Sequence, residues 1–134
     1  MNNRIYGKIT QIDESKVKEF FEKRFCRDNP LASVMVRANA NDTIAEKRNI
    51  NEIKKLHSLY DFSSKPRILD IGCGCGRWAA NLDKHFSSYC GVDFCENYIT
   101  AANEIFKDRP EISFRQMAAT ELNAHTFEEK FDLI

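Results

Sequence analysis

The sequence predicts an α/β fold in which helices cover a parallel β-sheet. Two observations lead to this prediction. From residue 67 onward, short apolar runs alternate with segments of helical periodicity, which is typical of parallel strands joined by helices. Between the first apolar run and the first of these helical segments lies a turn with glycines at positions 72, 74 and 76. A turn without side chains lets a ligand lie directly against the backbone.

The region before this alternation is predicted to be helical. Residues 17–25 carry one apolar stripe at helical spacing, and Asp13 or Ser15 is available as the N-cap. A second helix is expected to start at the cap Asp42 and to run to about residue 60. It should end before Pro66, because proline disfavours helix in the residue that precedes it.

The region from residue 66 onward is expected to form the sheet. Its strands are predicted at residues 67–71, 88–93, 112–116 and 131–134. The connecting segments are predicted as helices at 77–86 and 95–107, followed by a helical or irregular crossover at 118–130. Right-handed crossovers would place the carboxyl ends of all strands along one edge, where ligands bind in sheets of this kind.

These segments suggest two regions. Residues 1–65 are expected to form a helical cap or lid, and residues 66–134 an incomplete sheet core. The chain ends inside the predicted fourth strand, so we expect a fold that is cut short after that strand, as the N-terminal portion of a larger enzyme. The outer edge of a strand at Ile134 would be unpaired, which favours self-association or disorder there.

Composition excludes several classes of function. The chain has 134 residues, of which 43% are hydrophobic and 30% charged, and its 20 basic and 20 acidic residues cancel. This balance gives no reason to expect a nucleic-acid partner. No apolar run approaches the roughly 18 residues that cross a bilayer, and the N-terminus lacks the apolar segment of a secretion signal. We therefore expect no membrane association and a cytoplasmic location.

The cysteines do not predict a metal centre or a disulfide framework. There are five, an odd number, without a disulfide-rich spacing, so reduced thiols are expected. Cys73 and Cys75 lie two positions apart, but no second pair of cysteine or histidine residues is nearby in the sequence. No metal is expected.

Two interpretations of the glycine turn compete. The dinucleotide fingerprint Gly-x-Gly-x-x-Gly, counted from Gly72, requires a third glycine where the chain has Arg77. Counted from Gly74 it reaches Ala79, an accepted variant, but this leaves Gly72 unexplained. This interpretation would also place Asp70 beside two phosphates, which its carboxylate would repel. The acid before the turn suits an adenosine that bears a positively charged amino acid.

The stretch RILDIGCGCGRW resembles motif I of the class I S-adenosylmethionine-dependent methyltransferases. YCGVDFCENYI resembles the second family motif, a strand that ends in an acid, and FRQMAATEL with FDLI resembles the third and fourth. Together they cover about residues 67–134. The resemblance implies a Rossmann-like parallel sheet and S-adenosyl-L-methionine as the cofactor.

The resemblance also implies roles for residues of the first motif. The backbone around Gly72, Cys73, Gly74 and Gly76 would approach the methionine and ribose parts of the cofactor, where any Cβ would clash. Asp70 would accept a hydrogen bond from the ammonium group of the cofactor, directly or through water.

The later motifs would hold the nucleoside. Asp93 would accept hydrogen bonds from both ribose hydroxyls, and Phe94 would lie against the face of adenine. Met117, Ala118 and Ala119 stand where the family contacts the adenine edge. The family often has an acid at the position of Ala118, which would accept from the adenine amino group, so the chain departs from the pattern there.

The catalytic residues are not identified by the sequence. His57, His85 and His125 have no spacing typical of a base or a metal site, and we interpret them as surface or partly buried residues. Trp78 is expected in the core. Tyr6 and Arg37, in the N-terminal region, are candidates for a lid. Arg37 would pair with a carboxylate of the cofactor or an anionic acceptor; the alternative, which we favour, is an ordinary surface arginine.

The predicted function is therefore methyl transfer from S-adenosylmethionine to an unidentified small-molecule acceptor. In such a reaction the protein supplies alignment and desolvation. A non-catalytic module or fragment that holds the same cofactor is the alternative hypothesis. A nicotinamide-nucleotide oxidoreductase with an unusual glycine turn is a third.

Overall fold

The structure, a computed structural model, describes residues 13–25, 27–28, 30 and 43–134. Its elements follow one another in the order helices, then alternating strands and helices. They are α1 (Glu14–Arg24), α3 (Thr43–Leu59), η1 (Phe62–Ser64), β1 (Arg67–Ile71), α4 (Arg77–Leu82), β2 (Ser88–Asp93), α5 (Glu96–Ile105), β3 (Ile112–Gln116) and η2 (Ala119–Glu121).

The three strands form a parallel sheet in the order β1-β2-β3, which confirms the predicted fold class. Ile71 pairs with Val92, and Asp93 pairs with Gln116, so the strands end at one common edge. The predicted fourth strand is present as a single parallel bridge between Ile68 and Leu133. This bridge lies on the side of β1 away from β2, so β1 is interior to the sheet.

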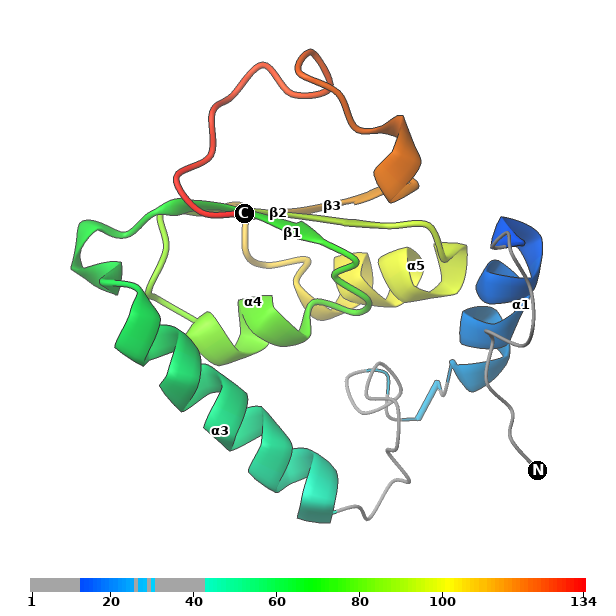
Figure 1. The fold of residues 1–134 in the computed structure, drawn as a ribbon, viewed down its shortest axis with the longest axis horizontal. Helices are drawn as coiled ribbons and strands as arrows, with labels where there is room; N and C mark the ends of the chain where they lie inside the picture. Colours follow the sequence, from blue (N-terminus) through cyan, green and yellow to red (C-terminus); the bar gives the residue numbers. More distant parts are fainter. Residues whose placement is uncertain (1–12, 26, 29, 31–42) are drawn as a thin grey trace.

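Two layers cover the sheet (Figure 1). Helices α4 and α5 lie under one face, while the segment from residue 117 to the C-terminus passes over the other. Between the sheet and the helices is the larger core, which includes Ile68, Tyr89 and Phe114. The opposite face is covered by residues of the C-terminal segment, with Phe127 and Phe131 packing against a small cluster of strand side chains.

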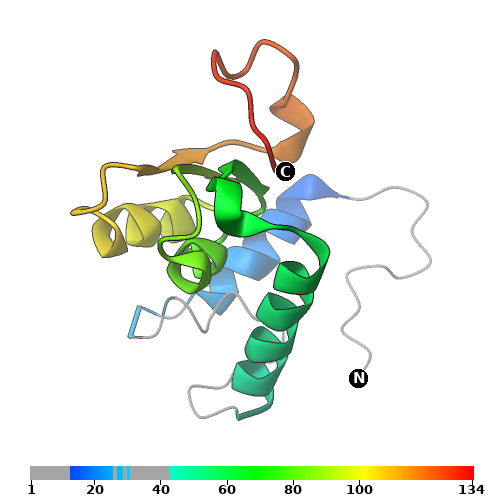
Figure 2. The same cartoon turned by 90° about the vertical axis from the view of Figure 1, so that its left-hand side faces the viewer.

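The N-terminal helices lie against the helical layer. α1 packs on α5, where Phe21 and Phe25 contact a cluster formed by Cys75, Cys95 and Tyr98, and the Tyr98 hydroxyl donates to the Phe21 carbonyl at 3.0 Å. α3 is a long helix whose C-terminal half lies near α4 and whose other end projects away from the sheet (Figure 2).

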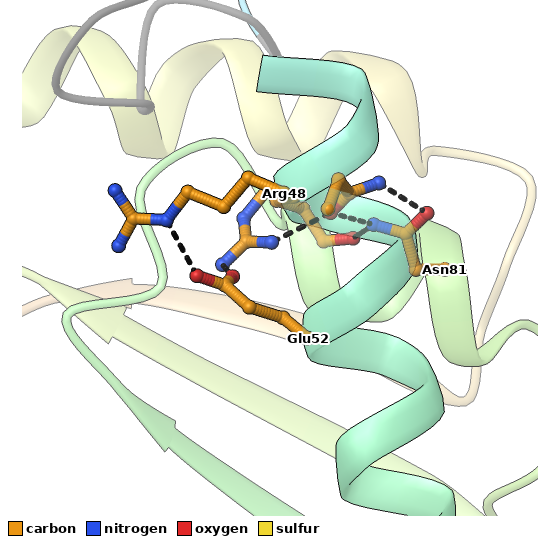
Figure 3. A network of polar contacts seen from close by, with 5 residues as sticks. Arg48, Glu52 and Asn81 are labelled. Atoms are coloured by element: carbon orange, nitrogen blue, oxygen red, sulfur yellow. Dashed lines mark hydrogen bonds and ion pairs between the residues drawn. The ribbon is translucent and has the colours of Figure 1, made fainter. Parts of the chain in front are cut away.

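Polar side chains join α3 to α4 (Figure 3). Arg77, the first residue of α4, donates to Asn49 at 2.6 Å and forms an ion pair with Glu52 at 3.0 Å. The other carboxylate oxygen of Glu52 accepts from Arg48 at 2.7 Å, and Asn81 exchanges hydrogen bonds with Asn49. This network fixes α3 beside the residue that directly follows the glycine turn.

The described helices agree with the sequence predictions except at the end of α4, and the predicted cap Asp42 lies outside the described residues. Asp13 caps α1, as predicted, by accepting from the backbone N–H groups of Ser15 and Lys16. α4, however, ends at Leu82 and not near Phe86. Asp83 adopts a positive φ of 38°, which stops the helix, and the chain turns so that Phe86 enters the core. The described helices include none that is both long and apolar enough to cross a membrane.

Candidate cofactor site

The glycine turn leads from β1 into α4 and is hydrogen-bonded to the carboxyl end of β2. The N–H groups of Gly72 and Cys73 both donate to the Val92 carbonyl, at 2.8 and 3.1 Å. The N–H of Gly74 donates to the Asp93 carboxylate at 2.9 Å. The turn is therefore tied to β2 by its first three residues, and Asp93 lies directly beside it.

All three glycines of the turn adopt positive φ angles, which side-chain-bearing residues rarely adopt. Their surroundings differ, however. A Cβ on Gly72 would meet nothing within 4 Å, whereas a Cβ on Gly76 would lie 2.7 Å from Phe114 and 2.8 Å from Phe106. Gly76 thus serves close packing against the core, and Gly72 leaves open space above the backbone.

Asp93 is the only buried charged residue among those that the structure describes, at 7% exposure. Its Oδ2 accepts from Gly74, and its Oδ1 accepts from the N–H of Cys95 at 2.9 Å. These two backbone donors compensate the burial of the carboxylate. Each oxygen retains a second lone pair, so the carboxylate is fixed in position and can still accept from a ligand.

Asp70 occupies a different environment on β1. It is half-buried, and the Tyr89 hydroxyl donates to its Oδ2. Burial raises the pKa of Asp70 above its ordinary value, although Tyr89 and the nearby Arg77 act in the opposite direction. Asp70 lines an apolar cavity of about 180 Å³ together with Trp78 and Leu133. Trp78, predicted to be core, is partly buried there.

Phe94, Met117 and Ala118 line a second cavity of about 380 Å³. The Met117 N–H donates to the Asp93 carbonyl at 2.8 Å, which places this cavity next to Asp93. Its remaining wall comes from Glu14, Ser15 and Lys18 of α1, and from Gln116 and Glu121 on either side of Met117 and Ala118. Ala119 is exposed in η2 and does not line it.

The structure therefore brings together some of the predicted site residues and separates others. Gly74 and Asp93 are in direct contact, and Phe94, Met117 and Ala118 share one cavity. Asp70 lines the other cavity, and the glycine turn lines neither of these two. The lid candidates Tyr6 and Arg37 lie outside the described residues.

Sequence reasoning did not find several neighbours of the site. The bond from Tyr89 to Asp70 follows from the alternation of side chains in paired strands, since Tyr89 pairs with Ile68 and shares the face on which Asp70 lies. The contribution of α1 to the second cavity has no signal in the sequence, because it depends on tertiary packing.

Other chemistry-bearing residues lie elsewhere. The rings of His57 and His85 are 5.0 Å apart at a pocket beside η1, and His125 lines a pocket at the C-terminal segment. Cys73 is buried, and burial raises the pKa of its thiol. The described part of the chain contains no group of three histidine, cysteine or acidic residues that could hold a metal ion.

Comparison with known proteins identifies a family. The family described as "Methyltransferase domain" matches residues 68–134, half of the chain. The ubiquinone biosynthesis O-methyltransferase of Hydrogenovibrio crunogenus is 25% identical over 126 residues, which cover 94% of this chain and 52% of the relative. The chain thus spans about half the length of this curated relative.

Solved structures show the same fold. The phosphoethanolamine N-methyltransferase 1 of Haemonchus contortus, solved with phosphoethanolamine and S-adenosylhomocysteine, has a TM-score of 0.63 at 23% identity; the match covers 81% of this chain and 22% of that one. The N-methyltransferase NodS of Bradyrhizobium japonicum, solved with S-adenosylhomocysteine, has a TM-score of 0.63 at 19% identity, covering 87% and 54%.

Proposed function

Since this chain belongs to the methyltransferase-domain family, we propose that it is of the class I type, binds S-adenosylmethionine and takes part in transferring the methyl group to a small-molecule acceptor. The observation that carries the proposal is the position of Asp93. A buried carboxylate held by two backbone N–H groups stands at the end of β2, directly beside the glycine turn.

The residues present fit the nucleoside part of this cofactor. Asp93 would accept from both ribose hydroxyls, one on each oxygen, without releasing its backbone donors. The cavity beside it, lined by Phe94, Met117 and Ala118, would receive the adenine ring. Phe94 offers an aromatic face, and Met117 a polarizable apolar side chain.

The residues around Gly72 fit the methionine part. The space that Gly72 leaves open would allow close approach of the cofactor to the backbone. Asp70, once ionised, would accept a hydrogen bond from the ammonium group. When bound, the cofactor supplies an activated methyl group on a sulfonium, and the protein aligns this group and excludes water from it.

The region before residue 66 would act as a cap on this site. α1 supplies part of the wall of the cavity at Phe94, and its Phe21 contacts the Phe94 ring at 6.3 Å between centroids. Tyr6 and Arg37 remain candidates for further cap residues. The balanced charge and the name of the curated relative favour a small molecule as acceptor over a nucleic acid.

Two experiments test this proposal. Isothermal titration calorimetry should detect binding of S-adenosylhomocysteine and none of NAD; binding of NAD alone would favour an oxidoreductase instead. Acceptor-dependent release of S-adenosylhomocysteine in a turnover assay would then show an enzyme and exclude a non-catalytic binding module. Both keep the cofactor site, but only the enzyme shows acceptor-dependent release.

A further inference from the structure

His57 and His85 come together at the surface although they lie far apart in the sequence. His57 belongs to the last turn of α3, and His85 follows the end of α4. Their ring centroids are 5.0 Å apart, with the ring planes at 77°. Both rings lie near the ring of Phe62, at 4.9 and 6.4 Å between centroids, and Phe62 itself is buried. Two imidazoles from different elements are thus held beside one buried ring.

The spacing of the two imidazoles suits a shared metal ion. Zn²⁺ bonds to histidine nitrogen at about 2.0–2.1 Å and adopts tetrahedral geometry. A tetrahedral ion that lies in the planes of two imidazoles at this bond length holds their ring centroids about 5 Å apart. Both histidines are exposed, so each ring can turn about its Cβ–Cγ bond and direct a nitrogen at the ion.

The charges around the two histidines favour a cation over an anion. Their pocket, of about 540 Å³, is also lined by Asp61. The Asp61 carboxylate accepts from the backbone N–H and the hydroxyl of Ser63, at 2.9 and 2.8 Å. These bonds lower the pKa of Asp61, so its carboxylate is ionised at neutral pH. The negative end of the α3 dipole lies at His57, and both negative charges would repel an anion such as phosphate.

We propose that His57 and His85 together bind a divalent ion that prefers nitrogen ligands, such as Zn²⁺. Imidazole suits this class of ion, whereas Mg²⁺ and Ca²⁺ prefer oxygen ligands. The described residues contain no group of three histidine, cysteine or acidic side chains that could hold an ion, so water completes the coordination of the two imidazoles. The ion joins the last turn of α3 to the segment after α4, the two helices that Glu52 and Arg77 also connect.

The test is isothermal titration calorimetry of the chain, without a histidine tag, with zinc chloride and separately with magnesium chloride. Wild-type protein should bind one equivalent of Zn²⁺ and no Mg²⁺. His57→Gln and His85→Gln each remove one of the two protein ligands. The affinity for Zn²⁺ should therefore fall in either variant by at least the roughly tenfold that the loss of an outer-shell partner typically costs a metal site.

His125→Gln is the matched control. His125 lines a different pocket, at the C-terminal segment, so this variant should bind Zn²⁺ as tightly as wild type. The inference is overturned if wild-type protein binds no Zn²⁺, or if His57→Gln or His85→Gln keeps the full affinity, as binding through cysteine would produce. A loss of affinity in His125→Gln as large as in the other two variants would also overturn it. None of these outcomes bears on the proposed function, because the two sites share no residue.

Discussion

At the residue scale, Gly72 and Gly76 share a backbone conformation but differ in what surrounds them. Both have φ near +80°, so alanine at either position should cost about 1–2 kcal/mol of strain. Only Gly76→Ala also drives a methyl group into Phe114 and Phe106, which adds about 1–3 kcal/mol of overpacking. Urea denaturation should therefore show the larger loss of stability for Gly76→Ala.

The same pair separates a packing role from a binding role. Gly72→Ala should reduce the affinity for S-adenosylhomocysteine while leaving a folded protein, because its Cβ would occupy the open space above the turn. Equal losses of stability in the two variants, or unchanged affinity in Gly72→Ala, would contradict the roles assigned to them.

Asp70 should make cofactor binding sensitive to acid. The ammonium group requires the ionised carboxylate, so affinity should fall as the pH drops through the pKa of Asp70. Because burial raises this pKa above 3.8, the loss should begin at a higher pH than for an ordinary aspartate. The contribution of Asp70 to the stability of the unliganded protein should instead increase as the pH falls through this window, since protonation relieves the burial of its charge.

Tyr89→Phe tests this assignment. The Tyr89 hydroxyl lowers the pKa of Asp70 by its hydrogen bond, so removing it should move the loss of affinity to higher pH. Tyr98→Phe is the control, because the Tyr98 hydroxyl bonds to the backbone of α1 and not to a carboxylate. Calorimetry from pH 7 to pH 5 gives the pH dependence of the affinity for each protein. Superimposable curves for wild type and Tyr89→Phe would contradict the role assigned to Asp70.

At the element scale, one carboxylate supplies the ion pair in the contact between α3 and α4. Glu52 pairs with both Arg48 and Arg77, and the Arg77 side chain is only 19% exposed. Glu52→Gln should therefore lower the free energy of unfolding by about 1 kcal/mol. Glu19→Gln, which removes an exposed pair with Lys23 on α1, should leave stability unchanged. Chemical denaturation measures the free energy of unfolding of both variants. Equal values would show that the two ion pairs of Glu52 stabilise the protein no more than the exposed pair of Glu19.

The elements themselves could be predicted where local signals are strong. The three strands follow from apolar runs bounded by turns, and α1 begins at its predicted cap because Asp13 accepts from two backbone donors of the first turn. The end of α4 could not be predicted. Asp83 stops the helix in a conformation that aspartate seldom adopts, and its carboxylate bonds to Arg109, far away in the sequence, at 3.1 Å.

At the scale of the whole molecule, sequence motifs located only part of the candidate site. Asp93 ends β2 and the glycine turn directly follows β1. Because these two strands are parallel neighbours, their carboxyl ends lie together, and the proximity of Asp93 to the turn follows. The wall contributed by α1 depends on how a distant helix packs, and the place of Glu121 in that wall depends on the turn η2. The cavity could therefore be identified only from the structure.

The edge of the sheet at Leu133, opposite the edge formed by β3, gives a prediction about assembly. Leu133 bonds to β1 on one side, and no strand of the described chain pairs with its other side. Ile134 is 77% exposed there. We expect concentration-dependent dimerisation in sedimentation velocity experiments, weakened by Ile134→Lys. A monomer at all concentrations would contradict this expectation.

We propose that the buried carboxylate beside the glycine turn holds the ribose of S-adenosylmethionine. Calorimetric titration of wild-type protein and Asp93→Asn with S-adenosylhomocysteine tests this assignment. The amide can accept hydrogen bonds on only one of its two terminal atoms, so we predict measurable binding by wild type and at least about a tenfold loss in the variant. Equal affinity in the two folded proteins would contradict the claim.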